Sequence, residues 1–197
     1  MLLAKHYFSA LLTALALVLG MSHAHAQNVD RKQPPAEFVD KIATQALEAV
    51  KDDAAAQKGD RAAINSLVNQ YVLPYVNFEK TTRLATGRYW RQASPEQRNA
   101  LVEASNNTLI RTYSGALANV NKLSSIQVGP FRGDANADDV VVRTTIIQRD
   151  GPAVGVDYRM EQSPEGWLIY DLNVEGIWLI QSYRNQFAEV IQRNGID

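Results

Sequence analysis

The sequence predicts an α+β domain, in which N-terminal helices and a C-terminal helix pack on one face of a curved antiparallel sheet of about four strands. Residues 35–120 carry apolar side chains three and four positions apart, which is the spacing of one helix face. Residues 123–174 instead alternate apolar with polar side chains, contain many β-branched residues and are divided by turn signals. Helices followed by a meander of strands are typical of the α+β class.

The first 26 residues have the features of a secretory signal peptide. Lys5 and His6 form a short basic start, and an apolar run covers residues 7–21. This run is shorter than the roughly 20 residues that a membrane-spanning helix needs. The Ala-His-Ala tripeptide ending at Ala26 fits the small-x-small rule for signal cleavage. We therefore expect export, cleavage near that residue and a single mature domain of residues 27–197.

The helices are predicted by their apolar spacing and by the residues at their ends. Pro35 suits a first helical position, Gly59 ends that helix and Asp60 caps the next one, which Pro74 bends or stops. A capping box at residues 94–97 (Ser-Pro-Glu-Gln) begins a long helix. The predicted helices cover residues 35–57, 60–74, 76–85 and 94–120, and an aromatic connector occupies residues 88–91.

The strands are predicted by alternation and by two turns. Asp150-Gly151 is a hairpin signal, and residues 163–166 (Ser-Pro-Glu-Gly) form a second turn. The last strand begins at Trp167 and is interrupted by Gly176, after which helical spacing continues to the end. The predicted strands cover residues 126–128, 138–149, 153–162 and 167–175.

The composition excludes several classes of function. The chain has no cysteine, so packing alone must hold an exported domain together. All three histidines (His6, His23 and His25) lie in the signal segment. The mature domain therefore lacks the groups for histidine-based acid–base catalysis, a Ser-His-Asp triad, a cysteine nucleophile or a typical zinc site. We expect no metal and no cofactor.

The charge pattern also limits the partners. The formal net charge is −1, with acids and bases interspersed. This argues against nucleic-acid binding and against strong electrostatic attachment to anionic lipid. Arg83, Arg88 and Arg91 are close in sequence and could bind a phosphate, but a solvated run of charges is the favoured interpretation.

Asp171 is the one acid expected among apolar residues. If the turn at residues 163–166 closes tightly, Tyr158 pairs with Asp171, which then shares a sheet face with Ile169 and Met160. A buried carboxylate must be paired or neutral. It could be the general base of a cone-shaped pocket. The favoured interpretation is structural, as a cap on nearby backbone amides or as an ion pair with one of three arginines, Arg143, Arg159 or Arg184.

The apolar residues allow two interpretations. The aromatic and aliphatic side chains around Pro74, together with Tyr89, Trp90 and Tyr113, exceed what one helix layer on a four-stranded sheet obviously requires. They could line a cavity for an apolar ligand. They could equally form an ordinary core, which periodicity alone favours.

Several motifs occur together along the mature chain. They are Pro74-Tyr75-Val76-Asn77-Phe78, Leu84-Ala85 with Gly87-Arg88-Tyr89-Trp90, the SPEQR helix start at Ser94, and Trp167-x-Ile169-x-Asp171 continuing through Gly176 to Tyr183-Arg184 and Phe187. In this order and spacing they resemble the MlaC / toluene-tolerance family of periplasmic phospholipid-binding proteins, which serve the Mla pathway of outer-membrane lipid asymmetry. The resemblance covers essentially the whole mature chain.

The resemblance implies a soluble periplasmic carrier rather than an enzyme. Such a carrier shuttles glycerophospholipids between the outer and inner membranes with their acyl chains in an apolar cavity between helices and sheet. Its implied partners are an inner-membrane ABC transporter with an MCE-domain subunit and an outer-membrane lipoprotein–porin complex, and we expect a monomer. The alternative is a small-molecule enzyme that uses Asp171 as a base.

The resemblance raises the cavity interpretation above the ordinary core. We expect Asp171 and Arg184 to form a structural ion pair that holds strand and helix together. The side chains that point between helices and sheet are expected to line the lipid-binding cavity, and they are Val72, Val76, Phe78, Trp90, Leu109, Tyr113, Val142, Val156, Tyr158, Ile169 and Tyr183.

Overall fold

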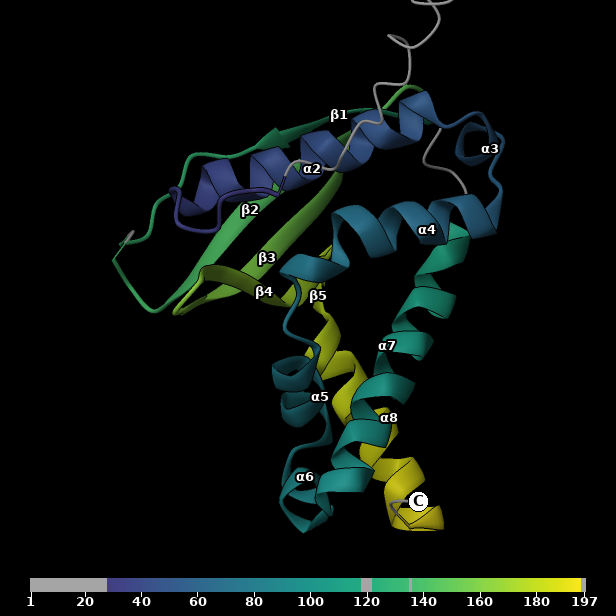
Figure 1. Cartoon of the computed structure of the whole chain (residues 1–197), viewed down its shortest axis with the longest axis vertical. Coiled ribbons are helices and arrows are strands. Elements are labelled where there is room, and N and C mark those ends of the chain that lie inside the picture. The colour runs from purple at the N-terminus through teal and green to yellow at the C-terminus, as the bar shows by residue number, and fades with distance from the viewer. Residues whose placement is uncertain (1–27, 118–121, 135, 196–197) are drawn as a thin grey trace, which may run out of the picture.

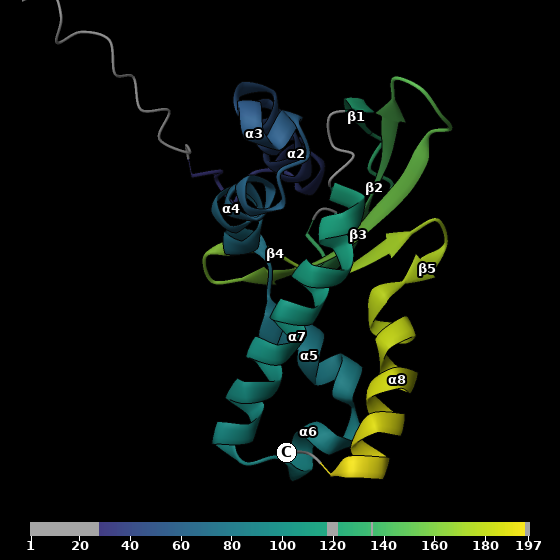
Figure 2. The ribbon, with the colours of Figure 1, turned by 90° about the vertical axis from the view of Figure 1, so that its right-hand side faces the viewer.

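The computed structural model describes residues 28–117, 122–134 and 136–195. It has an antiparallel sheet covered by helices at one end and a helical extension, made of α5, α6, α7 and α8, at the other (Figures 1 and 2). The helices are α2 (Pro35–Asp52), α3 (Ala54–Gln57), α4 (Arg61–Tyr71), the short 3-10 helix η1 (Leu73–Tyr75), α5 (Phe78–Thr86), α6 (Arg88–Gln92), α7 (Pro95–Leu117) and α8 (Leu179–Asn194).

The sheet confirms the predicted α+β class. Its strands pair antiparallel in sequence order, so the sheet is an open meander. The strands are β1 (Leu123–Val128), β2 (Asp139–Gln148), β3 (Val154–Ser163), β4 (Gly166–Val174) and β5 (Ile177–Trp178). The count of about four strands rises to five because Glu175 and Gly176, both with positive φ, form a two-residue hairpin turn that pairs Val174 with Ile177.

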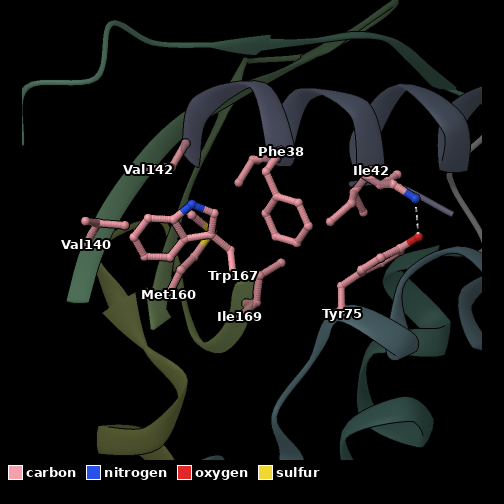
Figure 3. Packing of buried hydrophobic residues seen from close by; sticks show 10 residues of the cluster. Phe38, Ile42, Tyr75, Val140, Val142, Met160, Trp167 and Ile169 are labelled. Atoms are coloured by element: carbon pink, nitrogen blue, oxygen red, sulfur yellow. Dashed lines mark hydrogen bonds between the residues drawn. The ribbon is translucent and has the colours of Figure 1, made fainter. Parts of the chain in front are cut away.

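The main core lies between α2 and the sheet. Phe38 of α2 is fully buried and meets the Tyr75 ring edge-on, with 5.7 Å between ring centroids. Trp167 and Ile169 of β4 complete this core from the sheet side (Figure 3). Each such side chain contributes about 1.5–3 kcal/mol by leaving water. The Tyr75 hydroxyl accepts a hydrogen bond from the Val29 amide at 2.8 Å, which ties the N-terminal segment to η1.

The helix boundaries follow the local caps. The predicted helix of residues 35–57 divides at Asp53, whose carboxylate accepts hydrogen bonds from the amides of Ala55 and Ala56 and so starts α3. The aromatic connector of residues 88–91 is itself a short helix, α6. The capping box is confirmed, because Ser94 and Gln97 exchange hydrogen bonds of 2.9 and 3.2 Å at the start of α7. The end predicted for that helix near Val120 lies outside the described residues.

The register between β3 and β4 corrects one prediction. From the turn, the pairing proceeds as expected as far as Met160 opposite Ile169. A bulge at Tyr170 then shifts the register by one residue. Arg159 instead of Tyr158 therefore lies opposite Asp171.

Gly166 makes the closest backbone approach in this part of the fold, and we expect Gly166→Ala to destabilise the protein strongly. Its φ is +111°, and a Cβ there would lie 2.3 Å from the Arg31 carbonyl oxygen. That carbonyl accepts the Trp167 amide at 2.9 Å, so it cannot move freely. Strain and clash together should lower the free energy of unfolding by about 3 kcal/mol, measured by urea denaturation.

Gly176→Ala is the matched control. Its φ is +87°, but nothing lies within 4 Å of the added Cβ. Only the backbone strain remains, about 1–2 kcal/mol. Equal losses in the two variants would contradict the close approach at Gly166.

Candidate ligand-binding site

The helical extension contains an open apolar groove between α7 and α8, which we call the α7–α8 groove. Its volume is about 330 Å³. Leu101 and Ala104 line it from α7, and Phe187, Val190 and Ile191 line it from α8. Gln97, at the start of α7, and Gly195, just after α8, lie at one end of it. Figure 2 shows the start of α7 and the end of α8 at the end of the extension far from the sheet, so the groove lined by these residues reaches that end.

A smaller and more enclosed pocket, which we call the closed pocket, lies between α5, α7 and α8. Its volume is about 20 Å³, and it is lined by Thr81, Thr82, Ala85, Ser105, Thr108, Leu109, Leu179, Ile180, Tyr183 and Phe187. Ser105, Thr108 and Phe187 also line the α7–α8 groove, so the two spaces are adjacent. The rings of Tyr183 and Phe187 pack together with centroids 5.5 Å apart.

Thr82 is the unusual residue of the closed pocket. It is fully buried, and its hydroxyl has no hydrogen-bond partner in the structure. An unpaired buried polar group costs about 1–3 kcal/mol. A buried hydroxyl left unpaired beside a pocket indicates a place where a ligand or water atom is expected.

A third space of about 540 Å³ lies between α5, α6 and α7. Its lining is mixed, because Phe78, Trp90 and Val102 alternate with charged residues such as Glu79 and Glu103 along its walls. Arg98 also lines it and donates a hydrogen bond from Nε to the Trp90 carbonyl at 3.0 Å. This space is polar enough that a wholly apolar ligand fits it less well than the α7–α8 groove.

The predicted cavity residues are distributed over several places. Leu109 and Tyr183 line the closed pocket, and Phe78 and Trp90 line the third space. Val142 and Ile169 belong to the filled core, with Val76 and Tyr158 packed against it. Val156 is buried in β3, and Val72 is half-buried beyond α4. The side chain of Tyr113 lies outside the described residues.

None of the residues predicted to line the cavity lines the α7–α8 groove, and two of them, Leu109 and Tyr183, line the closed pocket. Thr82, Ser105 and Thr108 are small polar residues, which do not mark a cavity by themselves. The sequence signal that could have indicated the groove is the apolar and small residues at helical spacing on one face of each of two helices. Leu101, Ser105 and Thr108 recur on one face of α7, and Phe187, Val190 and Ile191 recur on α8.

Asp171 connects the sheet to the extension. Its Oδ1 accepts hydrogen bonds from the amides of Leu172 at 3.0 Å and of Ile180, in the first turn of α8, at 3.1 Å. Its Oδ2 lies 3.3 Å from Nη1 of Arg159. The side chain is only 1 % exposed. The guanidinium of Arg159 in turn lies 3.9 Å from the ring centroid of Trp178.

This geometry corrects the predicted partner of Asp171. The ion pair forms with Arg159 and not with Arg184, because the bulge at Tyr170 brings Arg159 opposite the carboxylate. The guanidinium of Arg184 lies beside Gly87 instead. Burial raises the pKa of Asp171 above its ordinary value of 3.8, while the amides of Ile180 and Leu172 and the charge of Arg159 lower it by less.

A second set of polar contacts ties α5 to the sheet. Lys80 pairs with Glu161 at 2.6 Å, and its Nζ lies 3.7 Å from the ring centroid of Tyr170. The Tyr170 hydroxyl donates to Asp139 at 2.7 Å. Burial, followed by that hydrogen bond, raises the pKa of Tyr170. The hydroxyl of Thr81 completes the contact by donating to the Tyr170 carbonyl at 2.6 Å.

The described residues include no cluster of three or more histidine, cysteine or acidic side chains that could hold a metal ion. Within the same residues, no helix combines the length and hydropathy needed to span a membrane. The strand order and the helices define an α+β domain with an open antiparallel sheet. Its extension has apolar-lined spaces like those of proteins that bind apolar ligands.

The chain belongs to the MlaC protein family, whose family model matches residues 40–197. Over 166 residues it is 28% identical to the toluene tolerance protein ttg2D of Pseudomonas putida, covering 84% of this chain and 76% of that protein. Over 144 residues it is 27% identical to the intermembrane phospholipid transport system binding protein MlaC of Haemophilus influenzae, covering 71% of this chain and 66% of that protein.

A solved structure is also similar. It is the phospholipid-binding protein of Ralstonia solanacearum in complex with a phospholipid, with a TM-score of 0.76 and 40% sequence identity. The match covers 83% of this chain and 89% of that one. The family resemblance seen in the sequence motifs is thereby confirmed.

Two substitutions of Asp171 should distinguish the contribution of its hydrogen bonds to backbone amides from that of its negative charge. Asp171→Asn keeps an oxygen that can accept from Ile180 but removes the charge next to Arg159. Asp171→Ala leaves the buried Ile180 and Leu172 amides without this acceptor. We expect Asp171→Ala to cost about 2–4 kcal/mol and Asp171→Asn about 1 kcal/mol, read from urea unfolding. A larger loss in Asp171→Asn would contradict the capping role.

The raised pKa of Asp171 also predicts a pH dependence. The native state binds this proton more readily than the unfolded chain. The contribution of the group to stability is therefore fully present below the unfolded pKa and is lost as pH rises through the folded pKa. Relative to Asp171→Asn, the wild type should gain stability as pH falls from 7 toward 4. The difference in unfolding free energy between the two proteins, measured across this range, removes the contribution of the other titrating groups. A difference that grows in favour of the wild type with rising pH would refute the expectation.

Proposed function

We propose that this protein is a periplasmic carrier of glycerophospholipids. The observation that carries the proposal is the similarity, at 40% identity, to a phospholipid-binding protein solved with its phospholipid. The MlaC and ttg2D relatives support it, since the name of the former describes intermembrane phospholipid transport. The apolar lining of the α7–α8 groove and the closed pocket supplies the kind of surface that acyl chains require.

The physical need for a carrier is large. The two acyl chains of a phospholipid contain on the order of thirty CH₂ groups, each worth about 0.8 kcal/mol when buried. They cannot cross an aqueous compartment without a protein that covers them. A carrier must also release them, so its apolar space has to open and close.

The α7–α8 groove and the closed pocket are the proposed site of one acyl chain. If a CH₂ group takes roughly the 30 Å³ of one water molecule in the liquid, the groove accommodates on the order of ten. Phe187, Ser105 and Thr108 line both the closed pocket and the groove, so a chain that follows both spaces would pass these side chains. The second chain needs further separation of helices, toward the other residues predicted to line the cavity.

Thr82 provides a polar contact within this site. Its unpaired hydroxyl can donate to the ester carbonyl of a bound lipid, which satisfies the buried group. An apolar pocket with one hydroxyl directed into it suits an amphiphilic ligand.

The proposed location and partners are based on the signal peptide and on the family resemblance. We propose that residues 1–26 are a signal peptide that is cleaved near Ala26, and that residues 27–197 form the single lipid-binding domain in the periplasm. The proposed partners are an inner-membrane ABC transporter with its MCE-domain subunit and an outer-membrane lipoprotein–porin complex. We propose that the carrier shuttles lipid between these membranes as a monomer.

The alternative of an enzyme with Asp171 as base is disfavoured by geometry. Both oxygens of that carboxylate are occupied, by amides and by Arg159, and the side chain lines none of the three spaces. A general base must reach the proton that it removes. We propose that the protein is a carrier and not an enzyme.

Filling the site should remove the lipid. Ser105 is buried and lines both the α7–α8 groove and the closed pocket, so Ser105→Phe places a ring in the proposed acyl path. Native mass spectrometry and lipid extraction of protein purified from a Gram-negative host should show phospholipid on the wild type. In Ser105→Phe the bound fraction should fall at least about tenfold, equivalent to 1.4 kcal/mol.

Asn107→Phe is the matched control, because Asn107 is exposed on the same helix and lines none of the three spaces. It should retain lipid as the wild type does. Wild-type protein that carries no phospholipid and takes up none from added vesicles would refute the carrier function. Equal lipid in Ser105→Phe and wild type would instead move the acyl site away from the groove.

A further inference from the structure

Arginines gather at one end of the molecule, although the net charge of the whole chain is −1. Arg83, Arg88 and Arg91 surround the α5–α6 turn and are exposed. Their exposure agrees with the solvated run of charges that the sequence favoured. None of the three has a carboxylate partner among the described residues.

A fourth arginine joins them from α8. Gly87, between α5 and α6, has a φ of +58°, and the position of its missing Cβ lies 3.7 Å from Nε of Arg184. Arg184 therefore lies against the α5–α6 turn, although about a hundred positions separate it from that turn in sequence. It is exposed, and it too has no carboxylate partner in the described chain.

Few acids lie in the segments around these arginines, although Glu79 precedes Arg83 by one turn of α5. The segments 83–98 and 184–193 contain two acids, Glu96 and Glu189. Glu189 is already paired with Arg193 at 2.6 Å, and Glu96 accepts a hydrogen bond from the Ser94 hydroxyl. Arg88 donates a hydrogen bond to the Tyr89 hydroxyl at 2.8 Å, but its positive charge, like that of the other three arginines, is not neutralised by a carboxylate among the described residues.

Arg88 and Arg91 belong to α6, at the free end of the helical extension, whereas Arg83 in the last turn of α5 and Arg184 of α8 lie beside the α5–α6 turn that leads to it. Figures 1 and 2 show α6, the start of α7 and the end of α8 together at this end, which we call the extension tip. The α7–α8 groove reaches the same end through Gln97 and Gly195. Val190, in the last turns of α8, is 55 % exposed and lines the groove.

We propose that the extension tip docks on the surface of an anionic phospholipid bilayer. Arginine guanidinium groups bind phosphate oxygens with two hydrogen bonds, which suits the lipid headgroups. An apolar groove that opens beside them suits the acyl chain of the same molecule. An acidic protein would match the charge but leaves the groove unexplained, whereas a bilayer matches both. The inference rests on the proposed carrier function and adds the surface through which a lipid would enter.

Electrostatic docking has a known range. Each lysine or arginine near an anionic membrane contributes on the order of 1 kcal/mol of attraction, and this attraction is screened within about 10 Å at 0.1 M salt. Removing two arginines should therefore weaken binding about 25-fold, which is roughly fivefold for each.

The test is flotation of the full chain with vesicles. We expect binding to vesicles of phosphatidylglycerol and phosphatidylcholine at 50 mM salt, little binding to phosphatidylcholine alone, and loss of binding at 0.5 M salt. Arg88→Gln/Arg91→Gln should bind about 25-fold more weakly. Lys51→Gln/Lys58→Gln removes two exposed lysines next to α3, outside the tip, and should bind as the wild type does.

The groove is tested by Val190→Asp, which should also reduce vesicle binding while urea unfolding stays near the wild-type value, because the side chain is exposed. Equal binding of the arginine and lysine double variants, or equal binding to both vesicle types, would overturn the docking surface. Native mass spectrometry on the same samples separates the two proposals. Charge-dependent docking by a protein that never carries phospholipid would refute the carrier function and leave the docking surface in place.

Discussion

The buried carboxylate of Asp171 joins the sheet to the helical extension, because it accepts a hydrogen bond from the first turn of α8. The helix α8 follows β4 after the two-residue turn and β5, so its first amides lie beside the last core residues of the sheet. A carboxylate at a helix N-terminus is favourable because it meets unpaired amides and the positive end of the helix dipole. Here that gain offsets only part of the cost of desolvation, so the pKa of Asp171 remains raised. The direction of α8, and with it one wall of the α7–α8 groove, is fixed at this point.

The bulge at Tyr170 determines which groups surround that carboxylate. One extra residue in β4 brings Arg159 opposite Asp171 and allows its guanidinium to stack on Trp178. The same bulge leaves Tyr170 beside Lys80 and within reach of Asp139. A single local irregularity therefore supplies the polar contacts that attach both α5 and α8 to the sheet. Bulges commonly redirect side chains in this way.

The sequence predicted the helices and strands better than the contacts that connect them. The capping box at Ser94 fixed the start of α7 because its hydrogen bonds are local, and the alternation of β2 and β3 fixed the order of the strands. The bulge at Tyr170 has no local signal, so the register beyond Met160 and the partner of Asp171 could not be predicted. The same holds for the site. Apolar periodicity marks Ile169 and Leu109 alike, but Phe38 fills the space beside the former, whereas helix separation leaves a pocket beside the latter.

The distribution of polar contacts explains why space occurs in the extension and not in the sheet layer. The hydrogen bond of Asp171 holds α8 at its sheet end, and the ion pair of Lys80 holds α5 at its sheet end. The core beside these contacts is filled. Toward the tip, the described contact between α6 and α7 is mainly that of Arg98 with Trp90, and α7 faces α8 across the groove. Helices fixed at one end and loosely joined at the other can separate at the free end at low energetic cost. The end held by the fewest of these contacts is therefore the end that carries Arg88 and Arg91, so under the proposed docking an acyl chain would enter between α7 and α8 while its phosphate remains at the surface.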